Sequence, residues 1–234
     1  MNKIPFVSAI VVAAGSGQRM QQALPKQFLP LGAKPILAHT ITNLLKCPLF
    51  SELILVLPAA FVDHPIVKDC LPDNLIPVKV VAGGPERQDS VYQALQHLDP
   101  AAEVVLIHDG VRPFVTANQI EQLLDRCQEY AGAILAIPIY ETVKEVENGI
   151  ILGTKKRHNL YLAQTPQVFR REIIANAYIQ AIADGFIGTD DAMLVERLGH
   201  KIAIVPGDRR NLKITCQSDL ELAKFLLNNE SNAV

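Results

Sequence analysis

The chain has 234 residues and a mass of 25.7 kDa, and 49% of its residues are hydrophobic and 20% charged. This ordinary globular composition excludes the disordered and fibrous classes. Its 22 Lys and Arg nearly balance its 24 Asp and Glu, for a net charge of −2. That balance argues against a nucleic-acid coat or an anionic membrane as partner, although a local basic cluster can still hold a small anion.

Short apolar runs alternate along the chain with segments of helical periodicity. This alternation predicts βαβ units and a mostly parallel sheet. Because the runs are wholly apolar, both faces of the sheet should be covered, which gives an α/β fold of three layers. The predicted strands are 7–13, 53–57, 78–82, 103–108, 133–139 and 201–205, and the predicted helices are 35–47, 85–98, one opened by Thr116, 171–183, 190–198 capped by Thr189, and a last one opened by Ser218.

Segment 140–161 interrupts this rhythm because it is polar and carries two basic clusters. It predicts a protruding hairpin with turns at Gly149 and Gly153, too small to be a domain. We therefore expect residues 1–234 to form a single domain, with 140–161 as an arm.

The four cysteines, Cys47, Cys70, Cys127 and Cys216, have neither metal-ligand spacing nor a CxxC motif. They indicate buried thiols in a reducing compartment. The apolar run 4–14 is too short to cross a bilayer and lacks the basic segment of a signal peptide. We expect a cytoplasmic protein without membrane contact, or a plastid protein if a transit peptide was removed.

The loop after the first predicted strand carries Gly15 and Gly17, followed by the cations Arg19 and Lys26. Ligands bind beyond the carboxyl ends of strands in such sheets, and glycines let backbone N–H groups approach a phosphate. A dinucleotide fingerprint is disfavoured because Met20 replaces its third glycine and no acidic residue ends the second strand. A P-loop would need Lys followed by Ser or Thr where Arg19 and Met20 stand. The two cations favour a nucleoside triphosphate.

Two further loops are ambiguous from their residues alone. The loop after the third strand carries Gly83, Arg87 and Ser90. These residues are equally typical of a nucleotide contact and of the start of a helix. Asp109 ends the fourth strand beside the glycine loop and suits a Mg²⁺ ligand, but an aspartate before glycine is also a common turn.

Seven motifs occur in order along the chain. They are Ala-Ala-Gly-x-Gly-x-Arg-Met at 13–20, Pro-Lys-Gln at 25–27, Gly-Gly-x-x-Arg-x-x-Ser at 83–90, His-Asp-x-x-Arg-Pro at 108–113, Thr-Pro-Gln at 165–167, Thr-Asp-Asp at 189–191 and Asn-x-Lys-x-Thr at 211–215. Together these motifs carry a family resemblance. The sequence closely resembles the 2-C-methyl-D-erythritol 4-phosphate cytidylyltransferases from about residue 10 to residue 222. The resemblance implies a Rossmann-like nucleotidyltransferase fold, a homodimer and a step of the non-mevalonate isoprenoid pathway. In that step CTP and methylerythritol phosphate give a CDP-linked alcohol and pyrophosphate, with Mg²⁺ or another divalent cation.

The resemblance also implies roles for individual residues. Arg19 and Lys26 would act at the transition state, and Asp109 would bind the metal and the nucleotide. Thr142 and Arg157 would reach the site from the partner's arm. The other nucleotide-binding positions would be Ala14, Gly15, Gly17, Gly83, Arg87, Ser90 and Arg112, and the second substrate would contact Thr142, Arg157, Thr165, Thr189 and Lys213.

Three alternatives compete with this interpretation. The nearest is a ribitol 5-phosphate cytidylyltransferase, which shares most of these loops; Ala14 before the glycine and Ala192 after the paired aspartates favour the methylerythritol enzyme. An NAD-dependent oxidoreductase is disfavoured by Met20. A non-catalytic nucleotide-binding module would be expected to lose Arg19, Lys26 or Asp109, all of which are present.

Overall fold

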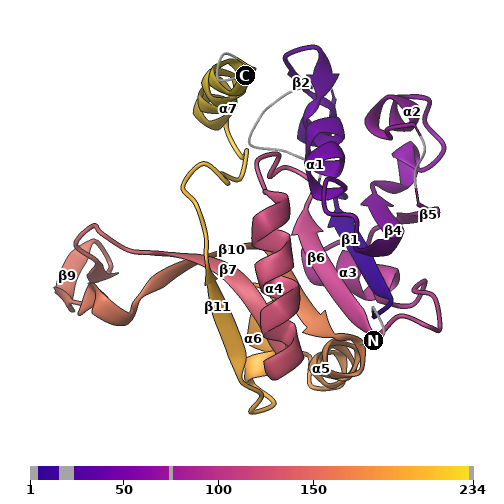
Figure 1. Ribbon diagram of the computed structural model, residues 1–234. Helices are drawn as coiled ribbons and strands as arrows, with labels where there is room; N and C mark the ends of the chain where they lie inside the picture. The colour runs from indigo at the N-terminus through magenta and orange to yellow at the C-terminus, as the bar shows by residue number, and fades with distance from the viewer. Residues whose placement is uncertain (1–4, 16–23, 74–75, 232–234) are drawn as a thin grey trace.

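The architecture is a seven-stranded sheet in the order β11-β7-β10-β6-β1-β4-β5, seen in a computed structural model that describes residues 5–15, 24–73 and 76–231 (Figure 1). Neighbouring strands run parallel except β10, which is antiparallel to both β6 and β7. The prediction of a mostly parallel sheet is confirmed. The strands are β1 (Val7–Val12), β4 (Phe50–Leu57), β5 (Val78–Ala82), β6 (Val104–Asp109), β7 (Gly132–Pro138), β10 (Tyr161–Arg170) and β11 (Ile202–Pro206).

Helices cover both faces of the sheet, so the predicted three layers are confirmed. In β4, Leu53 and Leu55 point into one core and Ile54 into the other, and all three are fully buried. Burial on both sides explains why the strand sequences are continuously apolar rather than alternating. One face carries α1 (Ile36–Leu44), α2 (Ile66–Cys70) and α4 (Ala117–Glu129), and the other carries α3 (Arg87–Leu95), α5 (Arg171–Ala183) and α6 (Asp191–Glu196).

A third apolar cluster packs the C-terminal helix α7 (Gln217–Ser231) against the small ribbon of β2 (Pro30–Leu31) and β3 (Lys34–Pro35). Leu220 of α7 shares this cluster with Leu31 and with Val111 from the loop after β6. The packing holds the segment between β11 and α7 over the carboxyl end of the sheet. The described residues also form the short 3-10 helices η2 (Lys26–Phe28), η3 (Ala59–Phe61) and η4 (Arg157–Asn159). No helix of the described ranges is long and apolar enough to cross a bilayer.

The central strand β10 is absent from the predicted elements. Its middle carries Gln164, Thr165 and Gln167, which are buried but polar, so the sequence there does not look like a core strand. The register also shifts between Gln164 and Gln167 where β10 pairs with β7. Buried polar side chains in a strand need partners, and these partners turn out to lie at the candidate site.

Four helices begin at residues other than those predicted. Helix α1 begins at Ile36, because Pro35, the first residue of the predicted helix, is its N-cap. The N-cap of α6 is Asp190 and not Thr189, because the Asp190 carboxylate accepts the backbone N–H of Met193 at 2.9 Å. Helix α7 begins at Gln217, one residue before the predicted Ser218. Helix α3 begins two residues later than predicted.

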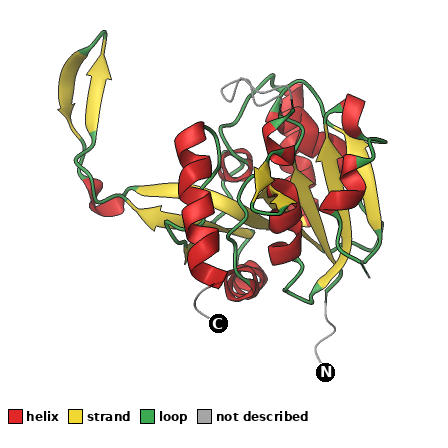
Figure 2. Ribbon diagram, turned by 90° about the horizontal axis from the view of Figure 1, so that it is seen from above, coloured by secondary structure: helices red, strands yellow, loops and turns green. Residues whose placement is uncertain are grey.

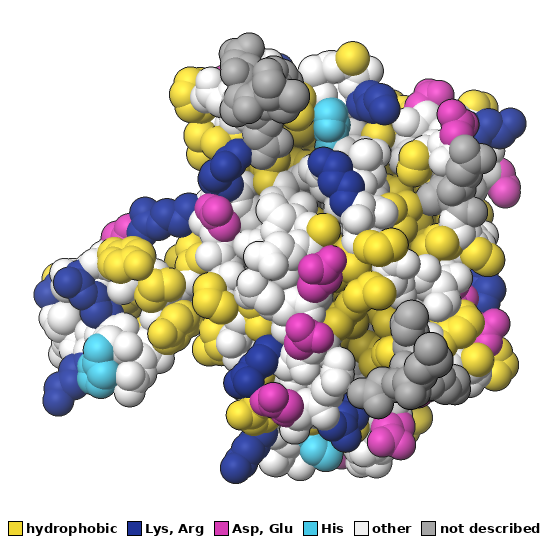
Figure 3. All heavy atoms as spheres, viewed as in Figure 1, with side chains coloured by type: hydrophobic (Ala, Val, Ile, Leu, Met, Phe, Trp, Pro, Cys, Tyr) yellow, Lys and Arg dark blue, Asp and Glu magenta, His cyan; other side chains and the backbone are white. Residues whose placement is uncertain are grey.

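The predicted hairpin is confirmed as β8 (Lys144–Glu147) and β9 (Ile150–Thr154), which pair antiparallel and stand away from the body (Figures 1 and 2). Asn148 and Gly149 form the turn with φ of 50° and 81°, as tight hairpin turns require. The predicted turn at Gly153 is wrong, because Gly153 lies within β9 and pairs with Glu145. Apolar side chains are exposed along the arm, among them Val146 and Ile150 at 55% and 67%, and they lie among basic ones in Figure 3. Apolar exposure of this extent is typical of a contact surface.

Candidate functional site

The site lies where the strand order changes direction. From β1 the chain moves outward to β4 and β5 and then crosses back to β6 on the other side of β1. Ligands of open α/β sheets bind at such a point, beyond the carboxyl ends of the strands. A cavity of about 160 Å³ opens there, with Ala14 and Gly15 on its wall. Its polar lining side chains come from four other segments and are Lys26, Gln27, Glu86, Arg87, Ser90, Asp109 and Lys213.

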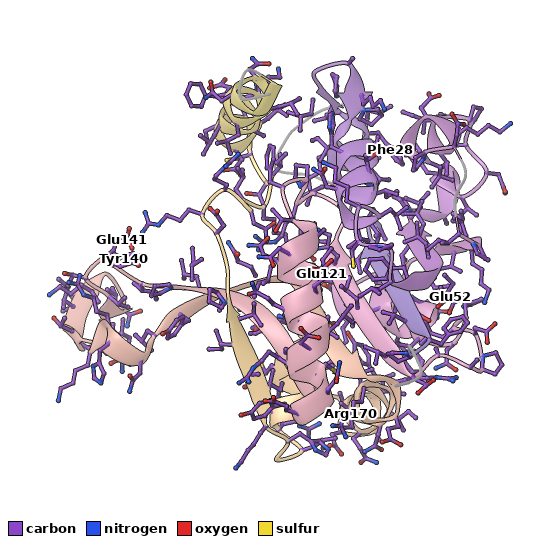
Figure 4. The ribbon with its side chains drawn as sticks, in the orientation of Figure 1. Phe28, Glu52, Glu121, Tyr140, Glu141 and Arg170 are labelled. Carbon is purple, nitrogen blue, oxygen red and sulfur yellow. The ribbon has the colours of Figure 1, made fainter. Side chains whose placement is uncertain are left out.

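A larger hollow of about 1070 Å³ lies at the amino ends of β1 and β6, beside α4 and α5. Val7, Val104 and Arg170 line it, and Figure 4 shows Arg170 at that end of the molecule. None of the predicted site residues that the structure describes lines this hollow. Ligands of open α/β sheets bind beyond the carboxyl ends of the strands, and the smaller cavity lies there together with Lys26, Arg87 and Lys213. The smaller cavity is therefore favoured as the functional site.

Asp109 is the centre of the charge arrangement. Its Oδ1 accepts from Arg87 Nε at 3.1 Å, and its Oδ2 lies 2.9 Å from Lys213 Nζ and 3.5 Å from Arg112 Nε. The carboxylate is only 5% exposed. Burial alone would raise the pKa of Asp109, but Arg87, Lys213 and Arg112 together hold it well below its usual range. Asp109 is therefore ionised throughout the physiological range.

Arg87 bridges two carboxylates. Its Nη1 and Nη2 donate to the two oxygens of Asp191 at 3.1 and 2.7 Å, while its Nε donates to Asp109. Asp191 also accepts from the Tyr178 hydroxyl at 2.5 Å. Burial alone would lower the pKa of Arg87, but Asp191 and Asp109 raise it above its ordinary value. The guanidinium thus stays charged at the cavity wall.

The strand β10 supports Asp109 through Thr165. The Thr165 hydroxyl accepts the backbone N–H of Asp109 at 3.0 Å and lies 3.0 Å from Nδ1 of His108, while His108 Nε2 lies 3.0 Å from the carbonyl of Arg112. Because a carbonyl can only accept, we assign the proton to Nε2, and Nδ1 accepts from Thr165. Asn211 completes the arrangement, since its side chain donates to the Thr165 carbonyl at 2.9 Å and its own carbonyl accepts from Arg112 at 2.8 Å.

The loops of the cavity approach one another closely. A Cβ at Gly83 would overlap the Cβ of Ala14 and the hydroxyl of Ser90, so only glycine fits between these loops. The buried Gln27 side chain donates to the Ala13 carbonyl at 2.5 Å and ties η2, with Lys26, to the end of β1. The sequence motifs contained Gln27 and Asn211, but nothing in the spacing assigned them these positioning roles.

Other predicted site residues lie elsewhere. Thr142 and Arg157 are exposed at the arm and do not line the cavity, and the Arg157 guanidinium donates to the carbonyl of Tyr140. Thr189 is exposed before α6, with its hydroxyl 3.5 Å from the sulfur of Met193. Gly17 and Arg19 lie outside the described residues.

The arm is attached at its root to the loop that carries Lys213. Arg209 Nη2 lies 3.1 Å from Oε1 of Glu141, and the guanidinium carbon lies 5.3 Å from the centre of the Tyr140 ring. Figure 4 shows Tyr140 and Glu141 together at this root. These side chains are exposed, so the contact guides the arm rather than fixing it.

Comparison with known proteins agrees with this geometry. The chain matches the family described as 2-C-methyl-D-erythritol 4-phosphate cytidylyltransferase over residues 7–229. The chain belongs to this family. A 2-C-methyl-D-erythritol 4-phosphate cytidylyltransferase from Syntrophus aciditrophicus is 45% identical over 98% of this chain and 99% of its own, and one from Aquifex aeolicus is 41% identical over 96% and 99%.

Solved structures agree as well. The crystal structure of 4-diphosphocytidyl-2C-methyl-D-erythritol synthase from Anaerococcus prevotii superposes with a TM-score of 0.85 at 32% identity, covering 97% of this chain and all of that one. The 2-C-methyl-D-erythritol 4-phosphate cytidylyltransferase of Thermus thermophilus gives 0.79 at 30% identity, over 95% and 99%. The Rossmann-like nucleotidyltransferase fold predicted for this cytidylyltransferase is confirmed, and the ribitol alternative is not favoured.

The buried His108 gives a stability prediction. Burial lowers the pKa of His108 to about 4, below the value near 6.5 of an unfolded chain. The unfolded state therefore takes up the proton first, and the contribution of neutral His108 is complete above about pH 6.5 and is lost as the pH falls toward 4. From pH 7.5 to pH 5 this group should lower the free energy of unfolding by about 2 kcal/mol.

Denaturant unfolding at both pH values would measure this loss. His108→Gln should make the pH dependence shallower, whereas the control His200→Gln should keep it, because His200 is exposed. Equal pH dependence in the wild type and His108→Gln would contradict the assignment.

Proposed function

We propose that the chain transfers the cytidylyl group of CTP to 2-C-methyl-D-erythritol 4-phosphate, giving 4-diphosphocytidyl-2-C-methyl-D-erythritol and pyrophosphate in the non-mevalonate isoprenoid pathway. The observation that carries the proposal is the cavity beside Gly15, where Lys26, Arg87 and Lys213 gather around Asp109. Cations beside a glycine loop suit a triphosphate, and the family match specifies the reaction.

In the reaction, a phosphate oxygen of the sugar alcohol attacks the α-phosphorus of CTP. A new O–P bond forms, the bond from the α-phosphorus to the bridging oxygen breaks, and pyrophosphate leaves with the electron pair. Two anions must meet, so positioning and positive charge matter more than a base. Lys26 and Arg19 would offset the charge that develops on the α-phosphate oxygens.

Asp109 would hold Mg²⁺, or another divalent cation, together with oxygens of the triphosphate. No group of three or more candidate metal-ligating side chains occurs in the described part of the chain. A single carboxylate nevertheless fits Mg²⁺, which commonly takes one or two carboxylates and completes its coordination with water and substrate phosphates. The metal would supply positive charge against the triphosphate.

The remaining roles divide between the two substrates. Thr189 and Lys213 would face the methylerythritol phosphate. Thr165 would also contact this substrate, and its hydroxyl accepts the backbone N–H of Asp109. The nucleotide would contact Ala14, Gly15, Gly17, Gly83, Arg87, Ser90 and Arg112.

The arm 140–161 would complete the site of a second copy in a homodimer, as part of a single domain spanning 1–234. Two features support this role. Its apolar side chains, such as Ile151 and Leu152, are 60% and 58% exposed, and Arg157 does not reach the cavity of its own chain. We also place the reaction in the cytoplasm, because all four cysteines are free thiols and three are buried.

Pyrophosphate release from CTP tests the function directly. With Mg²⁺ we expect rapid release with methylerythritol phosphate and little with ribitol 5-phosphate, and loss of release when the metal is chelated. Each acceptor alone, without CTP, is the blank. Faster release with ribitol phosphate would overturn the assigned substrate, and no release with either would overturn the assigned reaction.

A mixed dimer tests whether the arm acts in the partner's site. Lys26→Ala and Arg157→Ala chains should each be inactive, because each lacks a cation of the site. After co-refolding, about half the dimers are mixed, and in each of these one site carries both lesions and the other carries neither. About a quarter of all sites should therefore recover activity.

The matched control combines Lys26→Ala with Asp109→Asn, two lesions that both lie in the cavity of their own chain. That mixture should stay inactive, because every site in its mixed dimers keeps one lesion. No recovery from verified Lys26→Ala and Arg157→Ala mixed dimers would exclude the shared arm.

A further inference from the structure

We propose that Asp191 is a positioning residue that acts through Arg87: it fixes the Arg87 guanidinium against Asp109 and balances its charge, so that the Asp109 carboxylate stays available to a divalent cation and the nucleotide. The inference rests on the proposed function for its kinetic and metal-binding readouts. Its premise is geometric, since Arg87 touches both carboxylates.

The contact between Arg87 and Asp191 is bidentate, because Nη1 donates to Oδ1 and Nη2 donates to Oδ2. Three of the five N–H donors of the guanidinium are engaged, two by Asp191 and one by Asp109. Paired donors of this kind fix the plane of an arginine as well as its distance. The orientation of Nε toward Asp109 is therefore set by Asp191, on the far side of the guanidinium.

Asp191 is itself held rigidly. Its side chain is fully buried, it lies in the first turn of α6 directly after the N-cap Asp190, and it accepts from Tyr178 of α5. The adjacent Ala192 N–H donates to Gln167 at 3.0 Å, and Gln167 also donates to Asp190 at 2.8 Å. The start of α6 is thus fixed to β10, the strand that supports Asp109.

Stability alone does not explain a charge at this position. Buried ion pairs can often be replaced by apolar side chains with little loss of stability, because removing two charges from water is costly. Here the pair includes an arginine whose third contact reaches the cavity. A role in the site explains why a charged side chain stands at position 191, which packing alone does not explain.

The charge balance at Asp109 shows what Asp191 contributes. Asp109 alone would face three cations, Arg87, Arg112 and Lys213. Asp191 adds a second carboxylate that takes two of the contacts of Arg87. Without it the full charge of Arg87 would act on Asp109 and weaken the hold of Asp109 on a metal cation.

The first test removes the negative charge of the Asp191 side chain and keeps its shape. Asp191→Asn should weaken binding of Mn²⁺, measured in the presence of a non-reactive CTP analogue, and should lower kcat/KM for CTP, each by about 10- to 100-fold, the usual effect of losing a partner that orients a ligand. Asp109→Asn serves as the positive control. The matched negative control is Asp184→Asn, which removes an Arg–Asp pair of 2.6 Å between the ends of the same two helices, α5 and α6, away from the cavity.

Chemical rescue separates positioning from structural support. Millimolar guanidinium should restore part of the activity of Arg87→Ala, because Asp191 can hold the added ion, and should restore much less in Arg87→Ala with Asp191→Asn. Equal rescue in the two variants, or wild-type Mn²⁺ binding and kcat/KM in Asp191→Asn, would overturn the proposal. If Asp191→Asn does not fold, Tyr178→Phe removes one hydrogen bond to Asp191 and should shift the same quantities in the same direction by a smaller factor; unchanged values there would count equally against it.

A measurement without substrate keeps this test separate from the proposed function. The ¹⁵N resonance of Arg87 Nε–H should show slow exchange in the wild type and in Asp184→Asn, and faster exchange in Asp191→Asn. If that change occurs while the wild type releases no pyrophosphate, the proposed function fails and the positioning role stands. If exchange is unchanged in Asp191→Asn, the positioning role is wrong whatever the enzyme catalyses.

Discussion

The buried carboxylate of Asp109 is the interaction on which the site depends. It ends β6, and its three cationic partners come from α3, from the loop after β6 and from the segment after β11. Removing a carboxylate from water is unfavourable unless opposite charges and donors surround it. The same contacts that make this burial tolerable draw three separate segments around one point. The site is therefore assembled by its own electrostatics as much as by the apolar cores beneath it.

The antiparallel strand β10 makes this arrangement rigid. Thr165 takes the backbone N–H of Asp109, and Gln167 takes the N–H of Ala192 at the start of α6. Asn211 connects the loop after β11 to β10, because its side chain donates to the Thr165 carbonyl. A wholly apolar strand could pack between β6 and β7, but it could not supply these contacts. The polar residues of β10 therefore link the layer of helices to the reactive end of the sheet.

Much of the fold was predictable from the sequence, for physical reasons that can be named. Strand 78–82 and helix 171–183 have the predicted bounds, because apolar runs and helical periodicity report burial directly. The cavity was also predictable, since glycines and cations follow neighbouring strands. The strand β10 was missed because its centre is polar, and the first turn of α6 was interpreted as a simple cap. The link from Asp191 to Arg87 joins residues 104 positions apart, and no local pattern records such a contact.

We propose that the site described above binds a nucleoside triphosphate at the carboxyl ends of β1 and β6. A crystal structure of the protein with CTP and Mg²⁺ tests it most directly. We expect the phosphates in the cavity between Gly15, Lys26 and Asp109, with Arg87 still paired to Asp191. Phosphates bound in the large hollow near Arg170, at the opposite end of the sheet, would contradict it.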